Sequence, residues 1–157
     1  MAEVNPSATT TPKTTMKTEL WYSTSSSYSS MKQIFMVQEI PVLQAPKDSI
    51  NYGCLESSVE FQTEGTRKAD TIAIPILLVE AQHNELKALA SANTKVYFAV
   101  KLPESTTATA GHPLCEKFSG TIDLTFDTMS IDGMIQETLT IYKDSIVEET
   151  TWNTLSA

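Results

Sequence analysis

The segment Phe118–Asp127, FSGTIDLTFD, alternates between two kinds of side chain along its whole length. Successive side chains of a β-strand point to opposite faces, so this period of two predicts a strand with one buried face. The buried positions are Phe, Gly, Ile, Leu and Phe; the opposite positions hold only hydroxyls and carboxylates, without Lys or Arg: Ser119, Thr121, Asp123, Thr125 and Asp127. The function of the chain depends on what this acidic face looks onto.

The composition is that of one globular domain. The chain has 157 residues, of which 41% are hydrophobic and 19% charged, and a chain of this length buries roughly 70% of the surface it exposes when unfolded. No apolar run approaches the about 18 residues of a membrane helix. The N-terminal residues lack the apolar segment of a signal peptide, so neither a membrane anchor nor export by that route is expected. Cys54 and Cys115 form no CxxC pair, which favours reduced thiols.

The net charge of −8 restricts the partners of the protein. Proteins that bind nucleic acid through its phosphates need clustered Lys and Arg. This chain has 11 basic residues, and Arg67-Lys68 is their sole adjacent pair. Affinity for nucleic acid is therefore not expected, whereas a position close to DNA without binding is compatible with the charge.

The rest of the chain predicts a mainly β fold, a two-sheet sandwich or small barrel of about seven strands with one flanking helix and a long ordered loop. Pro75 cannot donate a ladder hydrogen bond, so its strand should lie at an edge or contain a bulge. That strand is apolar on both faces, which predicts cover on both sides. Asp132-Gly133 favours a tight turn. The expected strands are Thr18–Ser23, Lys32–Ile40, Ser58–Gly65, Asp70–Glu80, Lys95–Leu102, Lys117–Asp127 and Gly133–Lys143.

Three further segments complete the organisation. Ala81–Ser91 has the composition and apolar spacing of a helix. Pro41–Gly53 contains prolines that oppose regular structure, yet it is apolar, so we expect an ordered loop that packs against something; loops of this length are usually functional. Residues 1–17 are expected to be a flexible arm, residues 18–145 the β domain, and residues 146–157 a C-terminal arm.

The sequence offers few groups for catalysis or metal binding. His83 lacks a second good ligand on its helical face and is expected to be solvated. Asp123 and Asp127 should lie about 13 Å apart along their strand, too far to act on one bond. His112 and Cys115 are close only in sequence, a weak indication of a catalytic pair. No phosphate-binding or nucleophile motif is present, so we expect no enzyme activity, no metal and no cofactor.

The order of these elements is similar to that of a known family. The loop VQEIPVLQAPKDSINYG, the helix and strand LVEAQHNELKALAS and VYFAVKLP, and the final FSGTIDLTFD and GMIQETLTI occur in this succession between about Thr18 and Lys143. Together they resemble the major tail tube protein of long-tailed bacteriophages with non-contractile tails, in its compact single-domain form. The resemblance implies a sandwich with a flanking helix whose subunits form hexameric rings, and rings that stack into a tube.

In such a tube one sheet of each subunit lines the channel through which the genome leaves. The resemblance implies a virion protein, made in the host cytoplasm, whose partners are itself, a tape-measure protein, and tail terminator and distal tail proteins; double-stranded DNA passes without specific binding. The residues expected to line the channel are Ser119, Thr121, Asp123, Thr125, Asp127, Gln136, Thr138 and Thr140. Those expected in an inter-subunit loop are Pro41, Val42, Leu43, Pro46, Ile50 and Tyr52.

Other interpretations of the sequence stay open. A monomeric immunoglobulin-like binding or decoration module would share the strand count and the acidic surface, although a monomer has no reason to keep Pro41–Gly53 so apolar. The inner tube of a contractile tail shares the fold type. A thiol enzyme built on Cys115 is a further alternative, and polar residues on a sheet face are also compatible with plain exposure to solvent.

Overall fold

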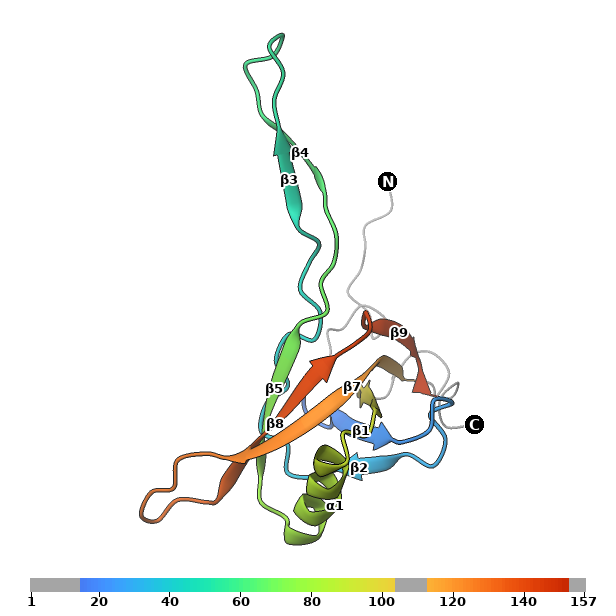
Figure 1. Cartoon of the computed structure of the whole chain (residues 1–157), viewed down its shortest axis with the longest axis vertical. Coiled ribbons are helices and arrows are strands. Elements are labelled where there is room, and N and C mark those ends of the chain that lie inside the picture. Colours follow the sequence, from blue (N-terminus) through green and yellow to red (C-terminus); the bar gives the residue numbers. More distant parts are fainter. Residues whose placement is uncertain (1–14, 104–112, 153–157) are drawn as a thin grey trace, which may run out of the picture.

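The computed structural model describes residues 15–103 and 113–152. These residues form mainly antiparallel β-structure with one helix, and a two-stranded hairpin projects far from the body (Figure 1). The elements are β1 (Glu19–Ser23), β2 (Lys32–Ile34), β3 (Ser49–Tyr52), β4 (Phe61–Glu64), β5 (Thr71–Leu77), α1 (Glu80–Ser91), β6 (Val96–Lys101), β7 (Leu114–Phe126), β8 (Gln136–Lys143) and β9 (Glu148–Thr151).

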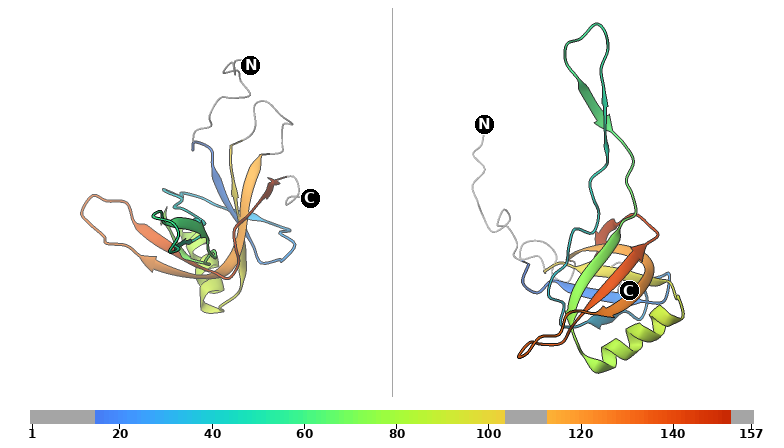
Figure 2. Two further views of the ribbon diagram at one scale, coloured as in Figure 1. Left: turned by 90° about the horizontal axis from the view of Figure 1, so that it is seen from above. Right: turned by 60° about the vertical axis from the view of Figure 1, so that its left-hand side comes forward.

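The body consists of two layers that share the long strand β7. The strand order is β2-β1-β6-β7-β8-β5, and β9 pairs with β7. The first half of β7 pairs with β6 and β9, and its second half pairs with β8, so the sheet folds over on itself (Figure 2). Along β7, Gly120 is the last residue that pairs with β6 and the first residue that pairs with β8. A Cβ at this position would overlap the carbonyl oxygen of Tyr142, so the close approach of the strands requires glycine.

The hydrophobic core lies between the layers and confirms the predicted sandwich. β5 and β8 supply branched side chains such as Ile74 and Leu139, both fully buried. From the other layer, Phe98 and Phe118 stack with ring centroids 5.4 Å apart. Full burial of each such side chain contributes about 1.5–3 kcal/mol, so the core accounts for most of the stability of the body. The buried cluster contains Leu20, Tyr22, Ile34, Leu43, Ile72, Ile74, Ile76, Leu86, Val96, Phe98, Val100, Phe118, Ile122, Leu124, Leu139 and Ile141.

Two predictions about individual strands are corrected. The strand predicted over Lys32–Ile40 ends at Ile34, because Met36 has a φ of 62° and turns the chain out of the extended conformation; the chain then makes a single bridge from Val37 to β5. β5 is an edge strand of the order, as Pro75 predicted. It is not covered on both sides, because its isoleucines are buried while Thr71 and Ala73 are exposed.

Helix α1 covers one end of the sandwich. Leu86 is fully buried, and the Gln82 side chain accepts a hydrogen bond from the Phe35 N–H (2.7 Å) and donates one to its carbonyl (3.2 Å). Lys87 Nζ donates to the Leu124 carbonyl at 3.3 Å. Since Phe35 follows β2 and Leu124 lies in β7, the helix is bonded to both layers.

The expectation that His83 is solvated is wrong. Its Nδ1 lies 2.5 Å from Oε2 of Glu137, and the two side chains are 18% and 1% exposed. The ring also stacks on Phe126. Glu137 lies on the same face of β8 as Leu139 and Ile141, so its carboxyl group points to the core side. Its other carboxylate oxygen, Oε1, has no hydrogen-bond partner among the described residues.

Replacing His83 with alanine should therefore be costly. The change leaves Glu137 buried without its partner, and breaking a buried polar pair in this way costs about 3 kcal/mol. Urea unfolding followed by circular dichroism measures the loss. The neighbouring Asn84 is exposed, so Asn84→Ala is the control and should change stability by less than about 0.5 kcal/mol. Equal stability of the two variants would show that the pair contributes nothing.

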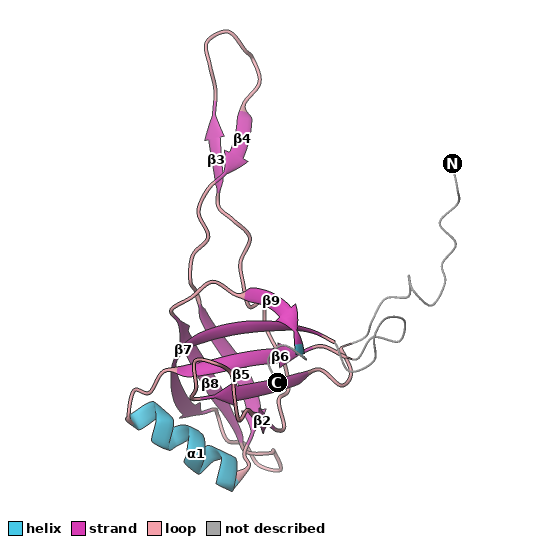
Figure 3. Cartoon of the chain, turned by 90° about the vertical axis from the view of Figure 1, so that its right-hand side faces the viewer, coloured by secondary structure: helices cyan, strands magenta, loops and turns pink. Residues whose placement is uncertain are grey.

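The predicted C-terminal arm contains a strand. Residues 148–151 pair with the start of β7 as β9 (Figure 3). Trp152 packs on Trp21 with ring centroids 5.1 Å apart, and the Lys101 ammonium group lies over the Trp152 ring. The polar composition hid this strand because β9 lies at an exposed edge. The predicted N-terminal arm, apart from its last residues, lies outside the described residues, as do residues 153–157. No helix in the described part of the chain is long and apolar enough to span a membrane.

Candidate functional site

The outward face of β5, β8 and the second half of β7 is continuous and lacks positive charge. The register aligns Asp123, Thr140 and Ala73 in one row across the three strands, with Thr125, Thr138 and Pro75 in the next. We call this surface the polar face; its residues are Thr71, Ala73, Pro75, Leu77, Thr121, Asp123, Thr125, Asp127, Gln136, Thr138, Thr140 and Tyr142.

Hydrogen bonds hold the carboxylates of the polar face in place. Asp127 Oδ1 accepts from Thr138 Oγ1 at 2.6 Å, and Asp123 Oδ1 accepts from the Leu124 N–H at 2.9 Å. Lys143, the only lysine of β8, lies on the opposite face of the strand and is buried. The polar face therefore presents fixed negative charges and small hydroxyls.

The residues predicted to line a channel lie on this face, with one exception. Ser119 is 4% exposed; its hydroxyl donates to Asp144 Oδ1 at 2.7 Å and lies 3.2 Å from Ser145 Oγ. Burial opposes ionisation of Asp144, but hydrogen bonds from Ser119 and Lys95 outweigh it and lower the pKa of that carboxyl group. The strand folds over at the next residue, Gly120, which places Ser119 in the other layer.

Sequence reasoning missed the contribution of β5 to the polar face. Thr71, Ala73 and Pro75 occupy the outward positions of this strand, and three isoleucines occupy the inward ones. The sequence predicts that this strand is apolar on both faces. The signal that distinguishes the faces is size, because small residues alternate with branched ones.

The projecting hairpin is the second candidate surface. We call residues 44–68 the arm. Its strands β3 and β4 pair only with each other among the described residues. The register places Ile50 opposite Thr63 and Tyr52 opposite Phe61, so these side chains share one face, and the two rings stack 5.7 Å apart. The other face carries Ser49, Asn51, Gln62 and Glu64.

The arm exposes apolar side chains that no other segment described by the structure covers. Tyr52 is 54% exposed and Phe61 41%, and Leu55 and Val59 near the tip are also exposed. A lone two-stranded hairpin is marginally stable in water, and exposed apolar patches mark interaction sites. The arm therefore has the properties of a segment that packs against another molecule.

The arm also corrects the prediction for Pro41–Gly53 and Ser58–Gly65. Ser49–Tyr52 and Phe61–Glu64 pair with each other outside the body, so the last part of the predicted loop forms one strand of a hairpin, and Ser58–Gly65 holds the other strand of that hairpin in place of a sandwich strand. Of the predicted inter-subunit residues, Val42, Pro46, Ile50 and Tyr52 are exposed and Pro41 is partly buried. Leu43 is 7% exposed and belongs to the core of the body.

Polar contacts fix the arm to the body at its root, which we define as residues 44–48 and 65–68. Lys143 Nζ donates to the Leu43 carbonyl just before the root, and burial lowers the pKa of this lysine. The Gln44 side chain donates to the Lys68 carbonyl at 3.0 Å and accepts from the Val147 N–H at 3.3 Å. These hydrogen bonds join the two segments of the root to each other, to the end of β8 and to the segment that follows β8.

The connection between β7 and β8 projects at the opposite end of the polar face from the arm (Figures 1 and 2). Asp132 has a φ of 63° and precedes Gly133, so the Asp-Gly turn lies where the sequence predicted it, within a longer loop. We call residues 127–135 the β7–β8 loop. Its exposed apolar side chains are Met129 (62%), Ile131 (93%), Met134 (76%) and Ile135 (45%).

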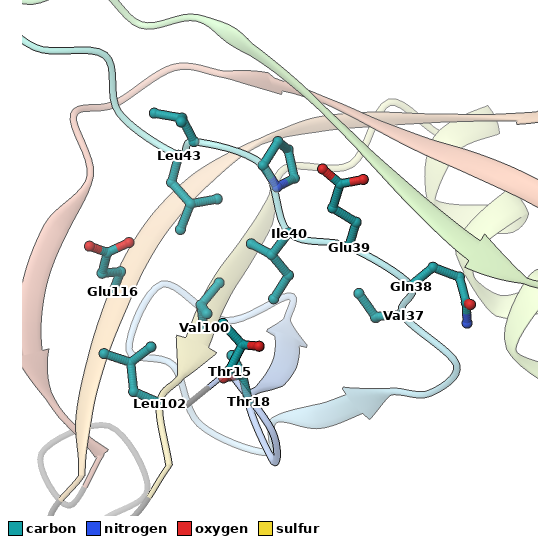
Figure 4. Close-up of a pocket in the computed structure, with 12 residues that line it drawn as sticks. Thr15, Thr18, Val37, Gln38, Glu39, Ile40, Leu43, Val100, Leu102 and Glu116 are labelled. Atoms are coloured by element: carbon teal, nitrogen blue, oxygen red, sulfur yellow. The ribbon is translucent and has the colours of Figure 1, made fainter. Parts of the chain in front are cut away.

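A cavity of about 530 Å³ lies between the segment that follows β2 and the ends of β6 and β7 (Figure 4). Its walls are mainly aliphatic, and Glu39 and Glu116 contribute carboxylates. The lining contains no histidine, cysteine or lysine. Within the described ranges no cluster of three or more metal-ligating side chains occurs.

Cys115 does not have the environment of a nucleophile. It is fully buried beneath Tyr28, Met31 and Trp152, and burial raises the pKa of its thiol to about 11. The thiol is therefore protonated near pH 7, and thiolate is the reactive form. His112, the other member of the weak pair, lies outside the described residues.

Comparison with known proteins identifies similar chains. The family described as phage tail tube, TTP, lambda-like matches residues 11–152. No curated protein matches the chain as a relative. A chain in the cryo-EM structure of the anti-feeding prophage (AFP) baseplate, 6-fold symmetrised, superposes with a TM-score of 0.62 at 6% identity, covering 88% of this chain and 95% of that chain. At this identity the likeness is one of fold.

Proposed function

Because the chain belongs to the lambda-like phage tail tube family, we propose that it polymerises as hexameric rings whose stack forms the channel for genome delivery. It is a structural tail protein of mainly β fold, and the polar face would line the channel. In this proposal DNA passes through the tube without specific binding, and the ends of the tube contact tape-measure, terminator and distal tail proteins.

One observation carries the proposal. The same chain has a sheet face with carboxylates and no positive charge, and an arm whose apolar face has no partner among the described residues. Phosphates repel Asp123 and Asp127 and find no Lys or Arg on the polar face. Without counterion-releasing contacts, DNA has no affinity for such a wall. A monomeric binding module, the alternative from the sequence, would have no use for an exposed amphipathic hairpin.

The hexameric ring is supported by the structural neighbour, which belongs to an assembly described as 6-fold symmetrised. Closed rings remove the free edges of sheets by pairing them between subunits. β5 and β2 are the end strands of the order among the described residues, and β9 adds a further edge beside β7, so these strands offer edges for lateral contacts.

Electron microscopy of the concentrated, purified protein tests the proposal directly. We expect rings or tubes with a central hole, of one diameter, because lateral closure fixes the number of subunits. A species that stays monomeric by light scattering at the highest attainable concentration and in every salt condition would overturn the proposed function.

A further inference from the structure

The β7–β8 loop exposes apolar side chains that the proposed channel does not use; of its residues only Asp127 belongs to the polar face. We propose that this loop of one subunit docks against the arm root of a second copy in the adjacent ring. The inference rests on the proposed stacking of rings and assigns the two surfaces that meet in it.

The first argument is the position of the two surfaces along one strand. The β7–β8 loop ends where β8 begins, at Gln136. The arm root is bonded to the other end of β8, where Lys143 contacts the Leu43 carbonyl and Tyr142 pairs with Thr71 of β5. A shift of one copy along β8 therefore brings its loop to the root of the next copy (Figures 1 and 2).

The second argument is length. β8 has 8 residues and spans about 26 Å at the rise of an extended strand. The extended arm strand from Pro46 to Cys54 has a similar reach. When the loop of one copy touches the root of the next, the arm of that next copy can lie beside the body of the first without covering the polar face, so the apolar side chains of the loop and of the arm are covered in the same contact.

The third argument is charge. Lys47, Arg67 and Lys68 gather at the root. Lys47 pairs with Glu64 at 2.5 Å and Lys68 with Asp48 at 3.2 Å, whereas Arg67 is exposed and has no ion pair among the residues that the structure describes. The β7–β8 loop carries Asp127 and Asp132 and no cation. The signs are complementary, and complementary charges set the register of an interface.

The fourth argument is the kind of assembly that these surfaces permit. The loop and the root are different surfaces at opposite ends of one subunit, so their contact is heterologous and continues from copy to copy. A contact of the loop with itself would close as a dimer. Met129 and Met134 give the loop flexible apolar side chains that adapt to a partner surface.

Cross-linking between introduced cysteines tests the contact. The exposed Cys54 is replaced by serine, and the buried Cys115 stays because its thiol is protonated and covered. Ile131→Cys marks the loop and Thr66→Cys marks the root; both positions are exposed, so folding is preserved. Assembled tubes of the double variant are treated with a short bis-maleimide and separated under denaturing conditions.

A head-to-tail contact between rings links loop to root repeatedly, so we expect a ladder of covalent products that extends beyond the size of one ring. Each single-cysteine variant is the control and can form dimers at most. Tubes that yield only dimers, or a ladder that stops at the size of one ring, would overturn the inference and leave the proposed function intact. Failure of the unsubstituted protein to form tubes would overturn the proposed function instead.

A second marker covers the case in which Ile131→Cys itself weakens stacking. Thr128 is exposed in the same loop, and Thr128→Cys with Thr66→Cys should give the same extended ladder. Asn84→Cys on α1 replaces Thr66→Cys as a distance control and should give no ladder with the loop cysteine. A ladder from the α1 pair in place of the root pair would reassign the docking surface to the helix and refute the proposal.

Discussion

Replacing Ile50, Tyr52 and Phe61 together with serine is expected to abolish tube formation while the body stays folded. These side chains occupy the apolar face of the arm and contact no residue of the body core. Partial burial of three such side chains in an interface contributes about 4 kcal/mol, which corresponds to a rise of roughly a thousand-fold in the concentration needed for assembly. Sedimentation of the polymer as a function of protein concentration measures this threshold.

The matched control changes the opposite face of the same hairpin. Asn51→Ser and Gln62→Ser remove the pair of polar side chains that lies between the Ile50–Thr63 and Tyr52–Phe61 pairs. This variant should assemble like the unsubstituted protein. Thermal unfolding should be the same for both variants, because the arm forms its own sheet. If the apolar-face variant assembles at an unchanged threshold, the arm does not mediate contacts between subunits.

A positive charge on the polar face is expected to slow or block genome release. Asp123 and Thr125 are both exposed and neither is needed by the core, so Asp123→Lys with Thr125→Lys should cost the subunit little stability, about 0.5 kcal/mol for each change. Every subunit of the tube then presents ammonium groups that phosphates can condense on. The rate of DNA release from triggered virions measures the effect, and higher salt should partly restore it.

The control for this experiment places the same charges elsewhere. Glu149 on β9 and Ala88 on α1 are exposed and lie off the polar face, so Glu149→Lys with Ala88→Lys alters the net charge equally without changing the polar face. Normal release from this variant and slow release from the first would locate the effect on the polar face. Equal release from both, in tails of normal length, would show that the polar face does not line the channel.

Much of the body was predictable because alternation along a strand is a local property. The segment from Phe118 to Phe126 could bury Phe118, Ile122 and Leu124 only by exposing Asp123, and the structure has this arrangement, whereas Phe126 at the end of the strand is 50% exposed. The helix likewise followed from composition. The net charge of −8 was also available without coordinates, because charge is a sum over residues.

Pairing partners, in contrast, were decided only by the tertiary structure. Alternation shows which side of a strand is apolar but leaves open which molecule or strand covers that side. Phe61 was therefore predicted in a strand of the sandwich, whereas the register pairs its strand with β3 outside the body and leaves the side chain exposed. Glu137 fitted the alternating pattern of a strand, and only the approach of α1 showed that His83 is the partner of its buried carboxylate.

The strand fold at Gly120 is the clearest case of this division. The sequence determined that a polar face exists and that its charge is negative. The tertiary structure determined where that face ends, because the close crossing of β7 and β8 at Gly120 moves Ser119 to the other layer and adds β5 to the exposed side. The physical reason is that side-chain alternation acts over neighbouring residues, whereas the crossing depends on backbone contacts between residues far apart in the chain.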